Sequence, residues 1–135
     1  MDDVLINKVA QIERCLHRIE EVYQKDAANL VDYTKQDSII LNLQRAIEAA
    51  IDSAMRIVRI KKLGIPQTSR DAFSMLKDAK MLREGLGINL MSMVGFRNIA
   101  VHDYQNLNLG ILKEIIEVRL IDIKEFVEWI KMQMI

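Results

Sequence analysis

The sequence predicts an all-α fold, an antiparallel up-and-down bundle of four main helices with a shorter helix as a fifth element. Apolar residues recur at spacings of three and four over long stretches, which is the period of a helix. Only five Gly and one Pro occur among 135 residues, so few points interrupt the helices. No stretch alternates apolar and polar residues at the two-residue period of a strand. Long helices joined by short loops pack as antiparallel neighbours, which predicts a bundle.

The first helix is expected from about Asp3 to Lys25. His17 lies off its apolar stripe among charged residues, and we interpret it as a solvated surface residue. The segment from Ala27 to Tyr33 is expected to add only a short turn. The stripe consists of Leu5, Val9, Ile12, Leu16, Ile19 and Tyr23.

The second helix is expected to begin after a capping Asp37 or Ser38 and to run to about Leu63. Gly64 and Pro66 then supply a stop, because neither residue continues a helix well. Small residues on this helix permit the close approach of a neighbouring helix: Ala46, Ala49, Ala50 and Ala54.

One line of the second helix is charged with both signs, and it consists of Arg45, Glu48, Asp52, Arg56 and Arg59. The simpler interpretation is a solvated face, supported by an i,i+4 pair of Asp52 with Arg56 that contributes about 0.2 to 0.5 kcal/mol. The alternative makes Glu48 or one of the arginines a supporting wall of a functional cleft.

A short helix is expected after Thr68, because Thr68-Ser69-Arg70-Asp71 resembles a capping box. The fourth helix is expected to be capped by Asn89 or to begin at Gly87, and to end near Tyr104. Residues 105–108 are interpreted as a loop, since Asn favours turns and caps. The last helix is predicted to carry a heptad-like seam of Leu112, Ile116, Leu120, Ile123, Val127, Ile130 and Met134.

The charge balance excludes a strong global field, because 19 basic residues are matched by 19 acidic ones. Any contact with nucleic acid must therefore depend on a local basic site. The single Cys15 lies on the apolar stripe and has no partner for an intramolecular disulfide, which indicates a reducing compartment. The acidic start at Asp2 and Asp3 is unlike a signal peptide, and no apolar run reaches the roughly 18 residues that span a bilayer. We expect a single cytoplasmic domain over residues 1–135 with no membrane contact.

The first, second and last helices have broad apolar faces, and Trp129 and the apolar segment 132–135 add to them. This is more hydrophobic surface than one bundle needs to build its core. We therefore expect a homodimer.

Several common sites are absent from the sequence. One Cys and two distant His do not make a zinc site, and neither phosphate-binding glycine motif occurs. Cys15 has no convincing partners for thiol catalysis, and the paired Glu-x-x-His pattern of di-iron bundles is missing. No cofactor is expected.

The segment Arg97-Asn98-Ile99-Ala100-Val101-His102-Asp103-Tyr104 concentrates polar groups on an otherwise apolar helix. From Ile88 to Val101 apolar residues occupy every side of the helical wheel, which is typical of a buried helix. Burying a guanidinium, a carboxamide and an imidazole is costly unless each has partners or lines a cleft. The segment is therefore the candidate functional site.

On a regular helix Asn98 and His102 share one face with Gly95, which leaves that face open to a ligand or a neighbouring helix. Arg97 and Tyr104 point together, roughly 100° or more around the helix axis from His102. Three arrangements would bring the groups together. The arginine bends toward the histidine, or the helix ends near Val101 and a turn re-aims His102 and Tyr104, or a second subunit completes the site.

These groups could cleave RNA without a metal. An imidazole can take or give a proton near neutral pH, so His102 could deprotonate a ribose 2′-hydroxyl that attacks the adjacent phosphate. Arg97 could hold the phosphate oxygens by a bidentate contact. Asn98 could orient His102 or bind the nucleotide, and Tyr104 could stack on a base. The alternative is a structural network of satisfied polar groups.

The pattern Arg97-Asn98-x-x-x-His102 followed by Tyr104, with Val94-Gly95-Phe96 before it and a long amphipathic helix after it, resembles the HEPN superfamily and its HepT-like toxin branch. That family's signature is an Arg followed by four to six residues and a His. The resemblance covers essentially the whole chain in length and helix order, although about a dozen residues carry it specifically.

The resemblance implies a metal-independent endoribonuclease toxin, dimeric, with Arg97 and His102 as the catalytic pair and Asn98 as a helper. It also implies a nucleotidyltransferase antitoxin that adds adenylates to Tyr104, where anionic groups beside Arg97 would repel RNA. The zero net charge departs from the picture of a strong RNA binder. Two other interpretations remain, a non-catalytic nucleotide-binding or docking partner of a nucleotidyltransferase, and a plain helical dimerisation module.

Overall fold

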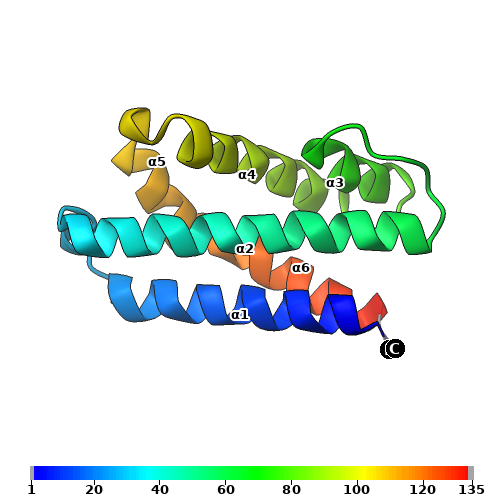
Figure 1. Cartoon of the computed structure of the whole chain (residues 1–135), viewed down its shortest axis with the longest axis horizontal. Helices are drawn as coiled ribbons and strands as arrows, with labels where there is room; N and C mark the ends of the chain where they lie inside the picture. The colour runs from blue at the N-terminus through cyan, green and yellow to red at the C-terminus, as the bar shows by residue number, and fades with distance from the viewer. Residues whose placement is uncertain (1, 134–135) are drawn as a thin grey trace.

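The chain folds into long helices that lie side by side and alternate in direction (Figure 1), as the sequence predicts. The structure, a computed structural model, describes residues 2–133. In chain order its elements are α1 (Asp3–Tyr23), the 3₁₀ turn η1 (Ala27–Leu30), α2 (Tyr33–Ile60), α3 (Ser69–Asp78), α4 (Glu84–His102), the 3₁₀ turn η2 (Tyr104–Asn106), α5 (Leu109–Glu114), a π turn (Ile115–Arg119) and α6 (Leu120–Gln133).

Helix α2 begins earlier than predicted. The Asp32 carboxylate accepts a hydrogen bond from the backbone N–H of Lys35 at 3.0 Å and caps the helix. The prediction of Asp37 or Ser38 as the cap is wrong, because an earlier Asp already satisfies the free N–H groups of the first turn. Asp37 is left on the helix surface with its carboxylate available for another contact.

The start of α3 is as predicted, and the start of α4 is not. The Thr68 hydroxyl accepts from the Asp71 N–H at 3.2 Å, as in a capping box, while the Asp71 carboxylate accepts from the Gln67 N–H at 2.9 Å. Helix α4 begins at Glu84 without a side-chain cap. Asn89, which the sequence offered as its cap, lies inside the helix and donates to the Asp122 carboxylate at 3.3 Å.

The predicted seam is buried at each of its described members, from Leu112 to Ile130, but the helix that carries it is not regular. A π turn separates α5 from α6, and its extra residue per turn shifts the register of the side chains that follow. Ile115 and Ile116 are therefore both buried next to each other. Met134, the last member of the predicted seam, lies outside the described residues.

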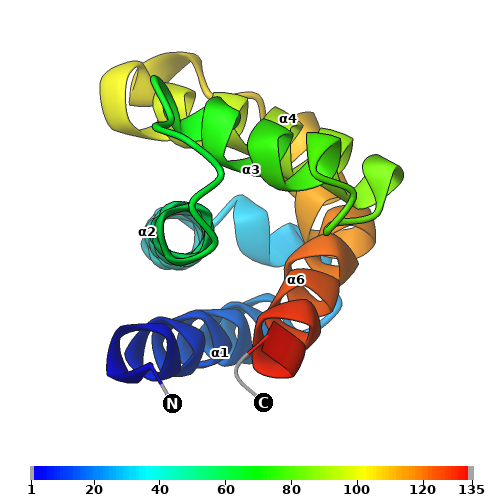
Figure 2. The same ribbon diagram turned by 90° about the vertical axis from the view of Figure 1, so that its right-hand side faces the viewer.

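Helix α2 occupies the middle of the bundle, between α1 on one side and α3 and α4 on the other (Figure 2). Its alanines are buried as predicted, and the core extends to α6 through aromatic rings. Phe126 meets Phe73 edge to face and stacks on Trp129, each with ring centroids 5.5 Å apart. The Trp129 indole donates to the Met81 carbonyl at 2.8 Å. Trp129 therefore packs against the core with one face of its ring, whereas the sequence analysis counted it as part of a dimer surface.

Charged residues of α2 pair across helices and not along α2. Asp52 binds Lys8 at 3.0 Å and Arg56 binds Asp2 at 2.9 Å, so the predicted pair of Asp52 with Arg56 is wrong. Both contacts hold α1 against α2. His17 is a surface residue paired with Glu21 at 3.1 Å, and Cys15 is buried.

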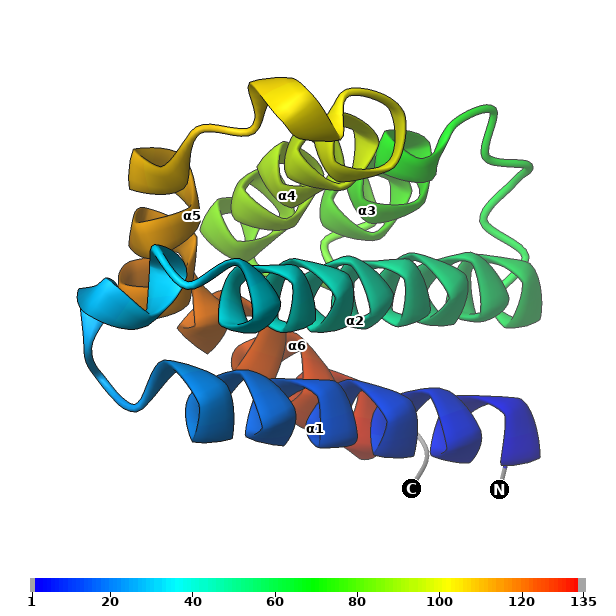
Figure 3. The same cartoon turned by 60° about the vertical axis from the view of Figure 1, so that its left-hand side comes forward.

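The connection between α4 and α5 lies at the same end of the bundle as the start of α2 (Figure 3). This arrangement brings the segment after His102 within reach of the first turns of α2. Within residues 2–133, no helix is both long enough and apolar enough to cross a membrane.

Candidate active site

Helix α4 is not buried on every side, contrary to the prediction from its apolar wheel. Ile88 is 50 % exposed and Ile99 is 42 % exposed, and both lie on the arc that also carries the exposed Asn98 and His102. The bundle covers α4 from α2 and α3 on one side and from α6 on the other, which leaves this arc open. Asn98 and His102 therefore face solvent in the single chain.

The Arg97 side chain is held by three acceptors from three helices and is only 17 % exposed. Its Nη1 donates to Glu48 Oε1 of α2 at 2.8 Å, its Nη2 to Ser69 Oγ of α3 at 3.0 Å, and its Nε to Asn98 Oδ1 at 2.9 Å. Three of the five guanidinium N–H donors are used, and two remain. Glu48 therefore contacts the candidate site, as the alternative interpretation of the charged line expects.

Asn98 orients Arg97 and not His102. His102 is the last residue of α4 and keeps the direction that a regular helix gives it. No hydrogen bond joins Arg97 to His102 in the described part of the chain. Of the three arrangements considered, the arginine does not bend toward the histidine, and no turn re-aims the histidine.

Tyr104 is re-aimed, because the helix ends one residue before Asp103 and a 3₁₀ turn follows. Its hydroxyl donates to the Asp37 carboxylate on the first turns of α2. Burial of the phenol, together with the hydrogen bond and the charge of Asp37, raises the pKa of Tyr104 to about 12. The hydroxyl is therefore protonated throughout the physiological pH range.

Arg70 lies over Gly95, on the face that the sequence left open. A Cβ atom at Gly95 would lie 2.9 Å from Arg70 Nη2, and Arg70 Nε donates to the Met91 carbonyl at 3.2 Å. The sequence pattern indicated Arg70 only as part of a capping box. The glycine makes room for a second arginine on the side of α4 that carries Asn98 and His102.

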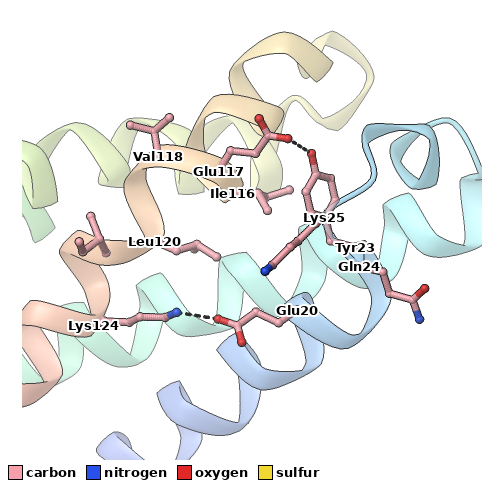
Figure 4. Close-up of a pocket in the computed structure, with 10 residues that line it drawn as sticks. Glu20, Tyr23, Gln24, Lys25, Ile116, Glu117, Val118, Leu120 and Lys124 are labelled. Carbon is pink, nitrogen blue, oxygen red and sulfur yellow. Dashed lines mark hydrogen bonds and ion pairs between the residues drawn. The ribbon is translucent and has the colours of Figure 1, made fainter.

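A cavity of 860 Å³ contains no residue of the motif. It lies between the end of α1 and the π turn (Figure 4), where Tyr23 donates to Glu117 and Lys124 pairs with Glu20 at 2.6 Å. Burial and the neighbouring Glu117 raise the pKa of Tyr23 to about 12. These four polar groups form two pairs, and the side chains of Gln24 and Lys25 also line the cavity.

Within residues 2–133, no group of three or more His, Cys, Asp or Glu side chains is placed to hold a metal ion. The polar groups of the motif are one imidazole, one guanidinium, one carboxamide and one phenol. Their chemistry is proton transfer and anion binding.

Comparison with known proteins decides the family. A family model described as ribonuclease HepT-like matches residues 12–130. The chain belongs to the HepT-like ribonuclease family. This confirms the resemblance to the HEPN superfamily and the ribonuclease class that the sequence motif predicted. The HepT-like chain is also 50 % identical over 131 residues to an mRNA nuclease HepT of Shewanella oneidensis, covering 97 % of this chain and 98 % of the relative.

Solved structures of similar proteins agree with the fold. A tri-AMPylated HEPN toxin of Shewanella oneidensis in complex with an MNT antitoxin matches with a TM-score of 0.91 and 50 % identity, over 97 % of this chain and 98 % of that one. A toxin–antitoxin complex with AMP-PNP matches with a TM-score of 0.90 and 48 % identity, over 96 % and 99 %. The Bacillus subtilis protein YutE, at 19 % identity and a TM-score of 0.72 over 92 % and 88 %, shares the fold alone.

The contact of Tyr104 with Asp37 predicts a pH dependence. The pKa of Tyr104 rises from 10.0 to about 12 on folding, so the contact contributes stability below pH 10 that is lost between pH 10 and 12. The difference in phenolate absorbance between wild type and Tyr104→Phe should titrate near pH 12, and at a lower pH in an Asp37→Asn background. A difference that titrates at pH 10 in wild type would show that the contact does not form.

Proposed function

We propose that this protein is the toxin of a toxin–antitoxin pair and that it cleaves RNA, with Arg97 and His102 as the catalytic residues. The observation that carries the proposal is an arginine fixed by Glu48, Ser69 and Asn98, followed on the same helix by a solvent-facing histidine, in a HepT-like chain. The named relative is an mRNA nuclease. We infer that the protein acts in the cytoplasm, because mRNA is found there and its reducing conditions keep Cys15 a free thiol.

In the proposed reaction His102 removes the proton from a ribose 2′-hydroxyl. The 2′-oxygen attacks the neighbouring phosphorus, the bond from phosphorus to the 5′-oxygen breaks, and the leaving oxygen takes up a proton. The products are a 2′,3′-cyclic phosphate and a free 5′-hydroxyl. The two free N–H groups of Arg97 bind the non-bridging oxygens and stabilise the charge that builds on them.

Glu48 and Ser69 act as positioning residues in this scheme. They fix the guanidinium before the substrate arrives, so little reorganisation is needed when charge develops on the phosphate. Glu48 also keeps Arg97 neutralised in the free protein. DNA lacks the attacking hydroxyl and is bound without being cleaved.

We further propose a homodimer built on the exposed arc of α4 and on α5. Ile88, Ile99 and Ile111 are exposed there, beside a 380 Å³ cavity between α4 and α5. This position differs from the sequence-based expectation, because the apolar faces of α1, α2 and α6 already build the core. His102 borders the same arc, so a dimer would bring two copies of the motif together and could supply the geometry that one chain lacks.

For regulation we propose a nucleotidyltransferase antitoxin that adds adenylate to Tyr104. The similar HEPN toxin is tri-AMPylated and complexed with an MNT antitoxin. Tyr104 lies two residues after His102, so added phosphates would lie next to the catalytic groups and repel RNA.

A second candidate is a non-catalytic nucleotide-binding or docking subunit of the nucleotidyltransferase. Two observations favour it, the tight pairing of Arg97 with Glu48 at 2.8 Å and the AMP-PNP in a similar toxin–antitoxin complex. Cleavage assays distinguish the two functions.

The catalytic assignment predicts that Arg97→Ala and His102→Ala each lower RNA cleavage by at least about 100-fold, while added chelator leaves wild-type cleavage unchanged. Cleavage of labelled RNA measures the loss, and Arg59→Ala, at the exposed end of α2, serves as the matched control. Full activity in either motif variant would reject the assignment. Absence of cleavage by wild type at high concentration would favour the second candidate.

The regulatory assignment predicts that Tyr104→Phe takes up no adenylate from ATP and the antitoxin, since it lacks the nucleophilic oxygen. Intact mass measures the additions, and Tyr33→Phe, with an exposed phenol on the first turn of α2, is the control that should be modified normally. Adenylate-sized additions on Tyr104→Phe would place the modification elsewhere.

The dimer assignment predicts that Ile99→Asp yields monomers, because a charge cannot be buried unpaired at the centre of an apolar interface. Analytical ultracentrifugation measures the change. Ile65→Asp, at an exposed loop position, should leave the mass unaltered. A wild-type protein that sediments as a monomer would contradict the proposal.

A further inference from the structure

Three arginines line a 540 Å³ cavity between α1 and the first half of α2. Arg14 and Arg18 come from α1, one turn apart, and Arg45 comes from α2. The polar side chains of Gln11 and Asn42 lie in the same wall. The cavity therefore concentrates positive charge in a chain whose total charge is zero.

Two of these arginines, Arg14 and Arg45, have no acidic partner in the described residues, and Arg18 has only a distant one. In the described residues no carboxylate lies within 4.0 Å of Arg14 or Arg45, and Arg18 is 4.0 Å from Glu21. The neighbouring acids of α1 are bonded to other cations: Glu13 to Lys131 at 3.3 Å, Glu20 to Lys124 at 2.6 Å, and Glu21 to His17 at 3.1 Å.

The charged line of α2 has the same imbalance. Three other residues of this charged line are paired: Glu48 with Arg97, Asp52 with Lys8, and Arg56 with Asp2. Arg45, which has no such partner in the described residues, lines the cavity. An arginine that stays unpaired beside paired neighbours can bind an external anion without first breaking an ion pair.

The buried Cys15 lines the same cavity as the three arginines. Burial raises the pKa of its thiol, and Arg14, Arg45 and Arg18 each act in the opposite direction by their charge. All three therefore lie within electrostatic range of one sulfur atom that the cavity touches.

The cavity is linked to the proposed active site through Asp37. Asp37 lines the cavity and also accepts the hydrogen bond from Tyr104. Arg45 lies one helical turn before Glu48, which holds Arg97. A chain of phosphates that leaves Arg97 can therefore follow the surface of α2 to the three arginines.

We propose that Arg14, Arg18 and Arg45 form a binding site for the phosphodiester backbone of an oligonucleotide that extends from the active site. The proposal rests on the proposed function for its ligand. Single-stranded nucleic acid is bound by grooves of positive charge that follow its backbone, and a neutral protein needs such a local site to hold RNA at all. The occupant is either the RNA substrate or an adenylate chain attached to Tyr104, because both offer the same phosphodiesters.

The test compares the triple variant Arg14→Gln, Arg18→Gln, Arg45→Gln with a control variant that loses three cations at the far end of α2: Arg59→Gln, Lys61→Gln, Lys62→Gln. The probe is a labelled single-stranded DNA oligonucleotide, which has the phosphodiester backbone but cannot be cleaved. Fluorescence anisotropy over a range of salt concentrations should give a slope of log K against log salt that is smaller by about two in the triple variant, given roughly 0.7 per phosphate contact. The control variant should keep the wild-type slope.

The single variant Arg18→Gln should lose about a third of that effect, which guards against misfolding of the triple variant. Equal slopes in the wild type and in both triple variants would overturn the proposal. RNA cleavage by wild type is measured in parallel. If wild type does not cleave RNA, the proposed function fails, while a reduced DNA slope in the triple variant still supports the site.

Two further measurements identify the occupant. The first measures the affinity for RNA of the same length in the triple variant and in wild type, each carrying His102→Ala to prevent cleavage. Weaker binding by the triple variant identifies the RNA backbone as the occupant. Release of adenylates from modified protein by an added phosphodiesterase is then compared, and faster release from the triple variant assigns the adenylate chain. If neither measurement differs from the control variant, the arginines hold neither chain and the proposal fails.

Discussion

The ion pair between Arg97 and Glu48 is the contact on which the functional end of the bundle depends. It joins α4 to the central helix α2, and the neighbouring bond from Arg97 to Ser69 adds α3. A guanidinium that is largely removed from solvent needs such acceptors, because an unpaired buried charge is costly. The same bonds fix the direction in which its two free N–H groups can meet a phosphate. Stability and function thus draw on one set of contacts.

Helix α2 acts as the shared support of the site, although it contributes no residue to the motif. Asp37 receives Tyr104 and Glu48 receives Arg97, while Arg45 between them is free to bind an anion. Substrate binding, catalysis and covalent regulation would therefore all depend on residues of α2. An adenylate on Tyr104 would extend its phosphates along the same surface that RNA would use, which gives a physical reason for mutual exclusion.

The helix order and the motif could be predicted from sequence because both depend on local patterns. The three-and-four spacing of apolar residues sets the helices, and Thr68 caps α3 as its local sequence indicates. The partial exposure of α4 could not be predicted. Apolar residues on every side of a helix show that each side could be buried, but they do not show whether the chain has enough neighbouring helices to cover every side. Arg70 was missed for a similar reason, since its contact with the Met91 carbonyl joins residues 21 positions apart.

By itself the sequence determined the all-α class, the family and the residues of the motif, because helical periodicity and residue chemistry are properties of neighbours in the chain. Only the tertiary structure decided which groups meet. It paired Glu48 with Arg97 and turned Tyr104 back to Asp37. It also left Arg14 and Arg45 without an acidic partner among the described residues. These outcomes depend on how the helices are rotated and translated against one another, which packing of the whole core sets and no local pattern specifies.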